Sequence, residues 1–327
     1  MKILVTGGAG YIGSHMVNML CNLGYSVVVV DSLVNRHRQA VDKRAEFIES
    51  CISSEKNIIR ALNGCDAVMH FASFIEANLS MKNPSKFFEN NVYFSIKLLD
   101  AMQKVGIKNI IFSSSGAIYG SPKYTPIDEN HPKEPENFYG QTKLFFENLL
   151  KWYERIYGFK FISLRYFNAT GADESGEIGE YHDPETHIIP LALKVALDQK
   201  KSIKIFGTNY NTEDGTCIRD YIHVNDLCKA HILALEYLTK HDKSDCFNLG
   251  TGKGNSVKNI ILNCERISGK NIEIVEDKRR EGDSEILVAS YKKAKKILRW
   301  EPKYTKIDSI IKTAWKWHKN NPNGFLK

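Results

Sequence analysis

The chain has 327 residues, of which 43% are hydrophobic and 25% are charged, proportions that are ordinary for a globular protein and exclude a disordered one. Its 45 basic and 38 acidic residues give a net charge of +7, but the lysines are dispersed, so we expect no nucleic-acid partner. No apolar run approaches the length that spans a bilayer, so we expect no membrane partner either.

The seven cysteines are scattered and form no Cys-x-x-Cys pair. This spacing predicts neither a disulfide framework nor a zinc site, and we expect no metal ion. Near the N-terminus, Gly7 follows the first apolar residues too soon for the hydrophobic stretch of a signal peptide. We therefore expect a cytoplasmic enzyme with reduced cysteines.

Short β-branched runs alternate with helix-period segments in the first half. The runs are 3–5, 27–30, 67–70, 110–113 and 161–164, and the segments 15–23 and 88–104 carry apolar residues three or four positions apart. The alternation predicts an α/β fold, a Rossmann-type doubly wound parallel sheet with right-handed crossovers.

The pattern of residue types changes after Asn168, where a polar stretch that contains glycines covers residues 171–185. Beyond it the pattern predicts a helix at 188–197, a strand at 202–206, a polar loop at 209–219 and closing helices at 289–297 and 307–318. The second half is thus predicted to be a smaller α+β domain.

Glycines cluster between the first strand and the helix that follows it. Gly8, Gly10 and Gly13 match the G-x-G-x-x-G spacing, and Gly7, Gly10 and Gly13 match a G-x-x-G-x-x-G spacing over the same loop. Such glycines let backbone N–H groups approach a pyrophosphate at a helix N-terminus. A glycine-rich turn without a ligand is the alternative.

Asp31 ends the second predicted strand, eighteen residues beyond Gly13. A carboxylate there can accept hydrogen bonds from an adenosine ribose and would repel a 2′-phosphate, which favours NAD over NADP. The alternative is an ordinary turn or cap residue.

Tyr139 and Lys143 are four residues apart, so they share one face of a helix. A tyrosine is a poor base at neutral pH, but a neighbouring ammonium and a positive nicotinamide ring both favour its phenolate form, which predicts a lowered pKa. Such a pair also occurs by chance. Ser113, Ser114 and Ser115 end a predicted strand that faces the ligand crevice of such sheets, where serines either act on a substrate or satisfy a turn.

Together these residues resemble the extended short-chain dehydrogenase/reductase superfamily and, within it, the UDP-glucose 4-epimerase family. The matching segments are 6–15, 70–72, 90–92, 113–120, 139–143, 164–168, 205–207, 212–216, 219–224, 248–250 and 280–283. The resemblance implies an NAD-binding domain at 1–168, with a return of 220–250, and a UDP-sugar-binding domain at 169–327.

By this resemblance Tyr139 is the catalytic base, Lys143 its activator, Ser115 a hydroxyl bonded to the reacting sugar oxygen, and Ser114 an assistant. The implied NAD-binding residues are Gly7, Gly10, Tyr11, Ile12, Gly13, Asp31, Asn35, Ile52, Phe71, Ala72, Asn90, Ser113, Tyr139, Lys143, Tyr166 and Phe167. The implied substrate-binding residues are Ser115, Tyr139, Asn168, His187, Ile188, Phe206, Arg219, Tyr221, Arg280 and Asp283.

The implied reaction inverts carbon 4 of a UDP-hexose. Tyr139 takes the 4-hydroxyl proton while carbon 4 gives hydride to NAD, and the resulting 4-keto sugar rotates and regains hydride on its other face. Cys51 replaces the acidic residue usual near adenine, which predicts weaker NAD binding. Leu287 is neither large nor small at a position that the family associates with admitting N-acetylated sugars, so UDP-N-acetylhexosamines stay open as substrates.

Related activities compete with this interpretation. Dehydratases need an acid or base beside the serine, and Gly116, Ala117 and Ile118 provide none. A UDP-glucuronate epimerase or decarboxylase, or a silent NAD-binding regulator, stays open. The resemblance also implies a homodimer formed through helices at 88–104 and 144–157.

Overall fold

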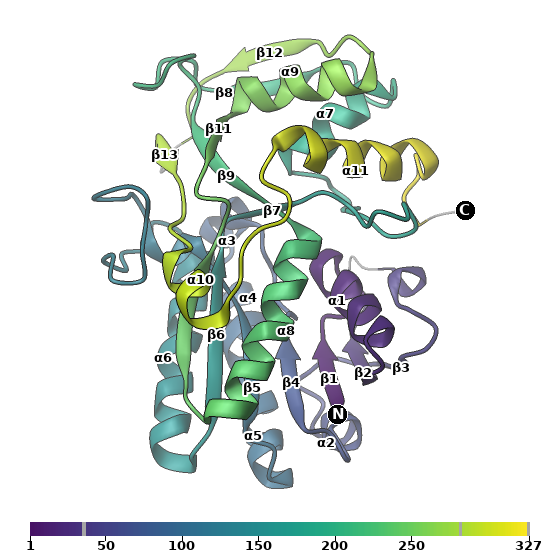
Figure 1. Cartoon of the computed structure of the whole chain (residues 1–327), viewed down its shortest axis with the longest axis vertical. Helices are drawn as coiled ribbons and strands as arrows, with labels where there is room; N and C mark the ends of the chain where they lie inside the picture. Colours follow the sequence, from purple (N-terminus) through teal and green to yellow (C-terminus); the bar gives the residue numbers. More distant parts are fainter. Residues whose placement is uncertain (35–36, 281–282, 326–327) are drawn as a thin grey trace.

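The computed structural model describes residues 1–34, 37–280 and 283–325. Its centre is a parallel seven-stranded sheet with the order β3-β2-β1-β4-β5-β6-β10 (Figure 1). The strands are β1 (Lys2–Thr6), β2 (Ser26–Asp31), β3 (Glu46–Glu49), β4 (Ala67–His70), β5 (Asn109–Ser115), β6 (Lys160–Tyr166) and β10 (Asp245–Leu249). The predicted doubly wound sheet is confirmed, and β3 and β10 extend it at both edges.

Helices cover both faces of this sheet. One face carries α1 (Tyr11–Asn22), α8 (Val224–His241) and α10 (Lys292–Leu298), and the other carries α2 (Glu55–Leu62), α5 (Phe94–Val105) and α6 (Phe138–Tyr157). Successive strand residues point to opposite faces, so Ile3 and Val5 join the first core and Leu4 the second. Both faces are apolar, which explains why the strands read as continuous β-branched runs.

The helix predicted at 88–104 is divided in the structure. After α3 (Ala77–Lys82), the chain forms α4 (Pro84–Phe88), a π-helical turn η2 (Glu89–Tyr93) and then α5. The Asn91 side chain in this turn accepts from the Phe74 amide at 2.8 Å and donates to the Phe74 carbonyl at 2.9 Å. These two hydrogen bonds connect the turn before α5 to the segment that follows β4. Asn90 lies in the same turn.

A smaller part lies at the carboxyl-terminal edge of the large sheet, at the top of Figure 1. It contains α7 (Ile188–Ala196), α9 (Val257–Ser268), α11 (Ile307–Asn320) and the parallel pair β8 (Ile203–Phe206) and β12 (Ile274–Asp277). It also contains β9 (Ile218–His223), which pairs with β7 (Asn168–Thr170), β11 (Gly254–Ser256) and β13 (Ile286–Leu287). Two short 3-10 turns, η1 (Arg38–Ala40) and η3 (Gly116–Tyr119), complete the described elements.

The chain crosses between the two parts more than once. It returns to the large sheet with α8 and β10, leaves for α9 and β12, and returns again with α10 and the buried Trp300. No helix within the described ranges is long and apolar enough to span a bilayer.

Candidate active site

A cleft of about 510 Å³ opens where the carboxyl ends of the large sheet meet the smaller part. All but one of the sixteen residues expected to bind NAD line it, and the exception, Asn35, lies outside the described residues. Six of the ten residues expected to bind substrate also line it: Ser115, Tyr139, Asn168, His187, Ile188 and Tyr221. The structure therefore gathers most of the predicted site in one place.

The glycine loop is shaped by close backbone contacts. Gly7 has a φ of +73°, and a Cβ atom on it would lie 2.5 Å from the Ala72 amide nitrogen. A Cβ on Gly13 would lie 2.1 Å from the Gly7 carbonyl oxygen. No described side chain caps α1 at Gly10, so its first-turn N–H groups can bind an anion. The loop thus fits the pyrophosphate of a dinucleotide.

Asp31 is buried and fixed by the backbone. Its carboxylate accepts hydrogen bonds from the amides of Ala9 at 3.0 Å and Leu33 at 2.9 Å. Two carboxylate oxygens offer about four acceptor positions, so lone pairs remain for ribose hydroxyls. Further along the cleft, Cys51 and Ile52 line the wall, and the Cys51 sulfur accepts from the Ser53 hydroxyl at 3.1 Å.

The three serines at the end of β5 point in two directions. Ser113 and Ser115 line the cleft, and the Ser113 hydroxyl hydrogen-bonds to that of Tyr166. Ser114 instead donates to Glu147 at 2.6 Å within the core beside α6. Because neighbouring strand residues face opposite sides of a sheet, the structure does not bring Ser114 to the cleft.

Tyr139 and Lys143 lie in the first turns of α6, where the Asn137 side chain accepts from the Gly140 amide at 2.8 Å. The Lys143 ammonium donates to the Ser113 carbonyl at 2.9 Å and lies 5.6 Å from the centre of the Tyr139 ring. The helix thus places both side chains against the end of β5, as their spacing predicted.

Burial dominates the protonation of this pair. It raises the pKa of Tyr139 to about 12, although a hydrogen bond with Ser115 acts in the opposite direction. It lowers the pKa of Lys143 to about 7. The predicted lowering of the Tyr139 pKa also counts on the positive nicotinamide ring of bound NAD, so it stays a prediction for the NAD-bound protein.

The remaining four predicted substrate residues form a group beside the cleft, here called the distal cluster: Phe206, Arg219, Arg280 and Asp283. The Arg280 guanidinium lies 3.8 Å from the centre of the Phe206 ring, and Arg219 forms an ion pair with Asp283. These residues do not line the cleft. Arg219 and the cleft-lining Tyr221 occupy alternate positions of β9, so they share one strand face.

Among the cleft-lining residues that the sequence reasoning missed, two carry ionisable side chains close to His187. Glu180 and His182 come from the irregular segment before α7 and lie beside His187. The cysteine spacing gives no indication of this group of side chains. The run Glu-x-His-x-x-Glu-x-His at residues 180–187 does indicate a possible set of metal ligands.

Residues 3–250 match the family described as the NAD dependent epimerase/dehydratase family. A UDP-glucose 4-epimerase from Lacticaseibacillus casei is 47% identical over 327 residues, which cover 99% of each chain. A crystal structure of a UDP-glucose 4-epimerase matches with a TM-score of 0.97 at 44% identity, covering 100% of both chains.

A UDP-glucose 4-epimerase from Bifidobacterium longum, in complex with NAD+ and UDP, matches with a TM-score of 0.92 at 37% identity, covering 99% of this chain and 100% of that one. The match to the family model spans the glycine loop, Asp31, Tyr139, Lys143 and Arg219. The chain belongs to the NAD dependent epimerase/dehydratase family.

Proposed function

We propose that the chain is an NAD-dependent UDP-hexose 4-epimerase that interconverts UDP-glucose and UDP-galactose. The observation that carries the proposal is one cleft that holds both the glycine loop with Asp31 and the Ser115, Tyr139 and Lys143 side chains. The Bifidobacterium longum relative, which binds NAD+ and UDP, supports the same pair of ligands for this chain.

Tyr139 takes the proton from the sugar 4-hydroxyl and later returns it, with Ser115 as its hydrogen-bond partner. Bound NAD+ supplies the hydride acceptor and a positive ring charge close to the tyrosine. Since burial holds the pKa of Tyr139 near 12 in the protein alone, the tyrosine depends on added positive charge to act as a base near neutral pH. Lys143 donates to the Ser113 carbonyl at the end of β5, beside Tyr139.

Inversion requires a firm hold on the UDP and freedom for the hexose. Asn168, Ile188 and Tyr221 line the cleft on the side of the distal cluster, where Arg219 and Arg280 provide positive charge. Guanidinium groups suit a diphosphate because two of their N–H groups can meet two phosphate oxygens. Ser114 is left out of this set because its hydroxyl is engaged by Glu147.

We assign NAD binding to residues 1–168, with a return at 220–250, and the UDP-sugar to residues 169–327. Seven free cysteines support a reducing compartment, hence the cytoplasm. A homodimer is supported by apolar side chains exposed on one side of the molecule: Phe88, Tyr93, Phe145, Trp152 and Ile156. Phe145→Glu combined with Trp152→Glu should give monomers in light scattering, whereas Leu262→Glu, at an exposed position on α9, should leave the dimer intact.

The activity test follows the anomeric NMR signals of UDP-galactose, and separately of UDP-N-acetylgalactosamine, without added NAD. Appearance of the gluco epimer would support a 4-epimerase with resident cofactor, and the two rates would settle whether Leu287 admits N-acetylated sugars. If neither sugar changes when NAD is supplied, the proposal is wrong. UDP-glucuronate turnover, or binding of NAD and UDP without turnover, would then identify the alternative.

A further inference from the structure

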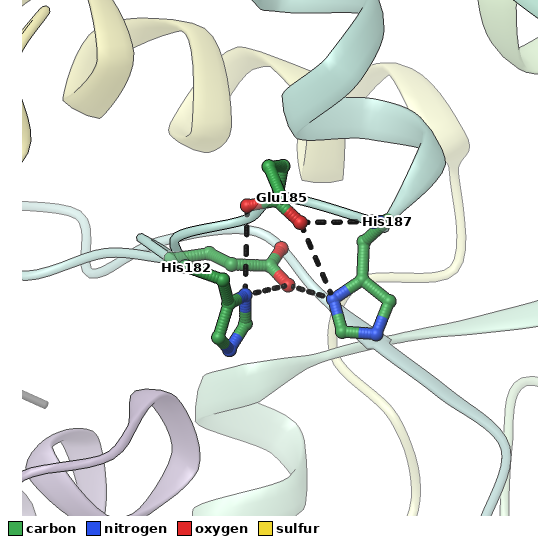
Figure 2. Close-up of side chains that lie close together, drawn as sticks. His182, Glu185 and His187 are labelled. Carbon is green, nitrogen blue, oxygen red and sulfur yellow. Dashed lines mark hydrogen bonds and ion pairs between the residues drawn. The ribbon is translucent and has the colours of Figure 1, made fainter. Parts of the chain in front are cut away.

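Four acidic and imidazole side chains converge in the irregular segment between β7 and α7. They are Glu180, His182, Glu185 and His187, here called the carboxylate–histidine cluster. Figure 2 shows the side chains of His182, Glu185 and His187 pointing toward one another. One ligand-type atom from each lies within 4.8 Å of the others. The cluster borders the cleft, since Glu180, His182 and His187 line it.

The separations suit a small tetrahedral ion. The His182 Nδ1 atom is 3.6 Å from Glu180 Oε1 and 3.5 Å from Glu185 Oε2, and His187 Nδ1 is 3.8 Å from Oε1, the other oxygen of Glu185. Metal–ligand bonds of about 2.0–2.2 Å in a tetrahedron place ligand atoms about 3.3–3.6 Å apart. The His187 Nδ1 atom lies 2.6 Å from Glu180 Oε1 in a hydrogen bond, and this separation would lengthen.

Two atoms that face the centre lack hydrogen bonds. Glu185, whose side chain is only 1% exposed, accepts at Oε1 from the amides of Thr186 at 2.7 Å and His187 at 2.8 Å. Its other oxygen, Oε2, and the His182 Nδ1 atom are buried without a hydrogen-bond partner among the described residues. These two atoms face each other as an ion pair at 3.5 Å, which is longer than a good hydrogen bond, and one cation between them would bind both.

The backbone around the cluster already holds the ligands in place. The amides of residues 186 and 187 orient the Glu185 carboxylate, which is how outer groups orient the ligands of a metal. Trp317 on α11 donates to the Glu180 carbonyl at 3.2 Å, and His187 is the N-cap residue that directly precedes α7. An ion here would cross-link the second half of a segment, residues 171–187, that has no regular secondary structure.

The donor set selects the kind of metal. Two imidazole nitrogens and two carboxylate oxygens suit a divalent transition metal, whereas Mg²⁺ and Ca²⁺ prefer oxygen ligands alone. The two carboxylates balance a charge of +2 when both histidines are neutral. We propose that the carboxylate–histidine cluster binds one structural zinc ion that fixes the cleft wall at His187.

Zinc content of the wild-type protein is the first test. Protein freed of any affinity tag and dialysed in chelator-free buffer should contain about one zinc per chain by mass spectrometry of the metal. After removal of metal by a chelator, added zinc should bind at an equimolar ratio and raise the midpoint of thermal unfolding, and added cobalt(II) should give the strong visible absorption of a tetrahedral site.

Matched variants locate the ion. His182→Ala and Glu185→Gln should abolish stoichiometric zinc and the cobalt absorption, and the glutamine keeps an oxygen that can accept from the two amides. His241→Ala and Glu236→Gln change exposed residues on α8 and should leave both unchanged. Circular dichroism checks that each variant is folded.

Two outcomes would overturn the proposal. In one, metal-free wild-type protein shows no zinc binding, no change in unfolding temperature and no tetrahedral cobalt spectrum. In the other, zinc binds but the folded His182 and Glu185 variants retain it as fully as the α8 controls do. Neither result tests epimerase activity. The zinc proposal can therefore be wrong while the proposed function is right, and the reverse also holds.

Discussion

The two sides of the candidate site are prepared for a ligand in different ways. On the sheet side, Gly7, Asp31 and Ser115 stand at strand ends, and their contacts with neighbouring backbone already hold them at the cleft. On the other side, the arginines of the distal cluster already have partners within the cluster, since Asp283 pairs with Arg219 and Phe206 lies against Arg280. The sheet side is preorganised, whereas the proposed diphosphate would have to replace Asp283 and Phe206 as the partners of the two arginines. The two sides should therefore respond differently to substitution.

Removal of the Tyr139 hydroxyl should have the largest effect. We expect Tyr139→Phe to lower kcat by about 10²–10⁴, because the proton of the 4-hydroxyl then has no acceptor in place. NMR initial rates with UDP-galactose measure the effect, and UDP binding by calorimetry should stay near the wild-type value. A variant with more than a tenth of the wild-type kcat would exclude Tyr139 as the base.

The buried residues that pack beneath the sheet side can be substituted without changing a residue that lines the cleft. Glu147 and Arg165 form a buried ion pair at 2.6 Å that also holds Ser114. Glu147→Ala leaves a buried guanidinium without its counter-charge and should lower the free energy of unfolding by about 3–5 kcal/mol in urea titrations. Glu301→Ala, which removes an exposed pair with Lys295, should cost at most about 1 kcal/mol. Equal losses in the two variants would contradict this difference.

The distal cluster should affect binding more than chemistry. We expect Arg219→Met to raise KM for UDP-galactose by about 10–100-fold with a much smaller change in kcat, since a charge-assisted hydrogen bond to phosphate is worth about 1.5–3 kcal/mol. Arg266→Met, at a half-exposed pair with Asp308, serves as the control. A large fall in kcat at unchanged KM would place Arg219 in the chemical step instead.

Lys143 should give the smallest and most gradual signal. Its pKa is lowered to about 7 in the folded chain from 10.5, so between these values the unfolded chain binds more protons and stability rises with pH. Relative to Lys143→Met, wild-type protein stripped of NAD should gain up to about 1.4 kcal/mol per pH unit between pH 7.5 and 9.5. Parallel urea titrations of both proteins check the slope, and a flat difference would show that the lysine is not desolvated.

Sequence reasoning succeeded where one local pattern fixes the outcome. Apolar runs buried on both faces predicted the core strands, and the glycine spacing predicted the loop, because these depend on neighbouring residues alone. β3 and β10 were missed because their sequences, Glu-Phe-Ile-Glu and Asp-Cys-Phe-Asn-Leu, contain charged and polar residues suited to sheet edges. Because successive strand residues face opposite sides of a sheet, the sequence itself indicates that Ser114 points away from the cleft when Ser113 and Ser115 face it.

Other features depend on contacts between distant segments. Nothing near Tyr139 in the sequence shows that burial raises the pKa of this side chain. The pairing of Arg219 with Asp283 joins residues 64 positions apart. The carboxylate–histidine cluster has a readable spacing, but only the packing of an irregular segment brings its four side chains to one point.

The repeated crossing of the chain between its two parts limits how the protein can be divided. The core beneath α8 includes Ala294, Leu298 and Trp300, and the Trp300 indole donates to the Asp226 carbonyl at 2.9 Å. A fragment that stops at the end of β10 would keep the whole glycine loop and all seven sheet strands, yet expose this core to water. No single cut along the sequence therefore yields a self-sufficient cofactor module, and a design that transplants the cleft must carry α10 and Trp300 with it.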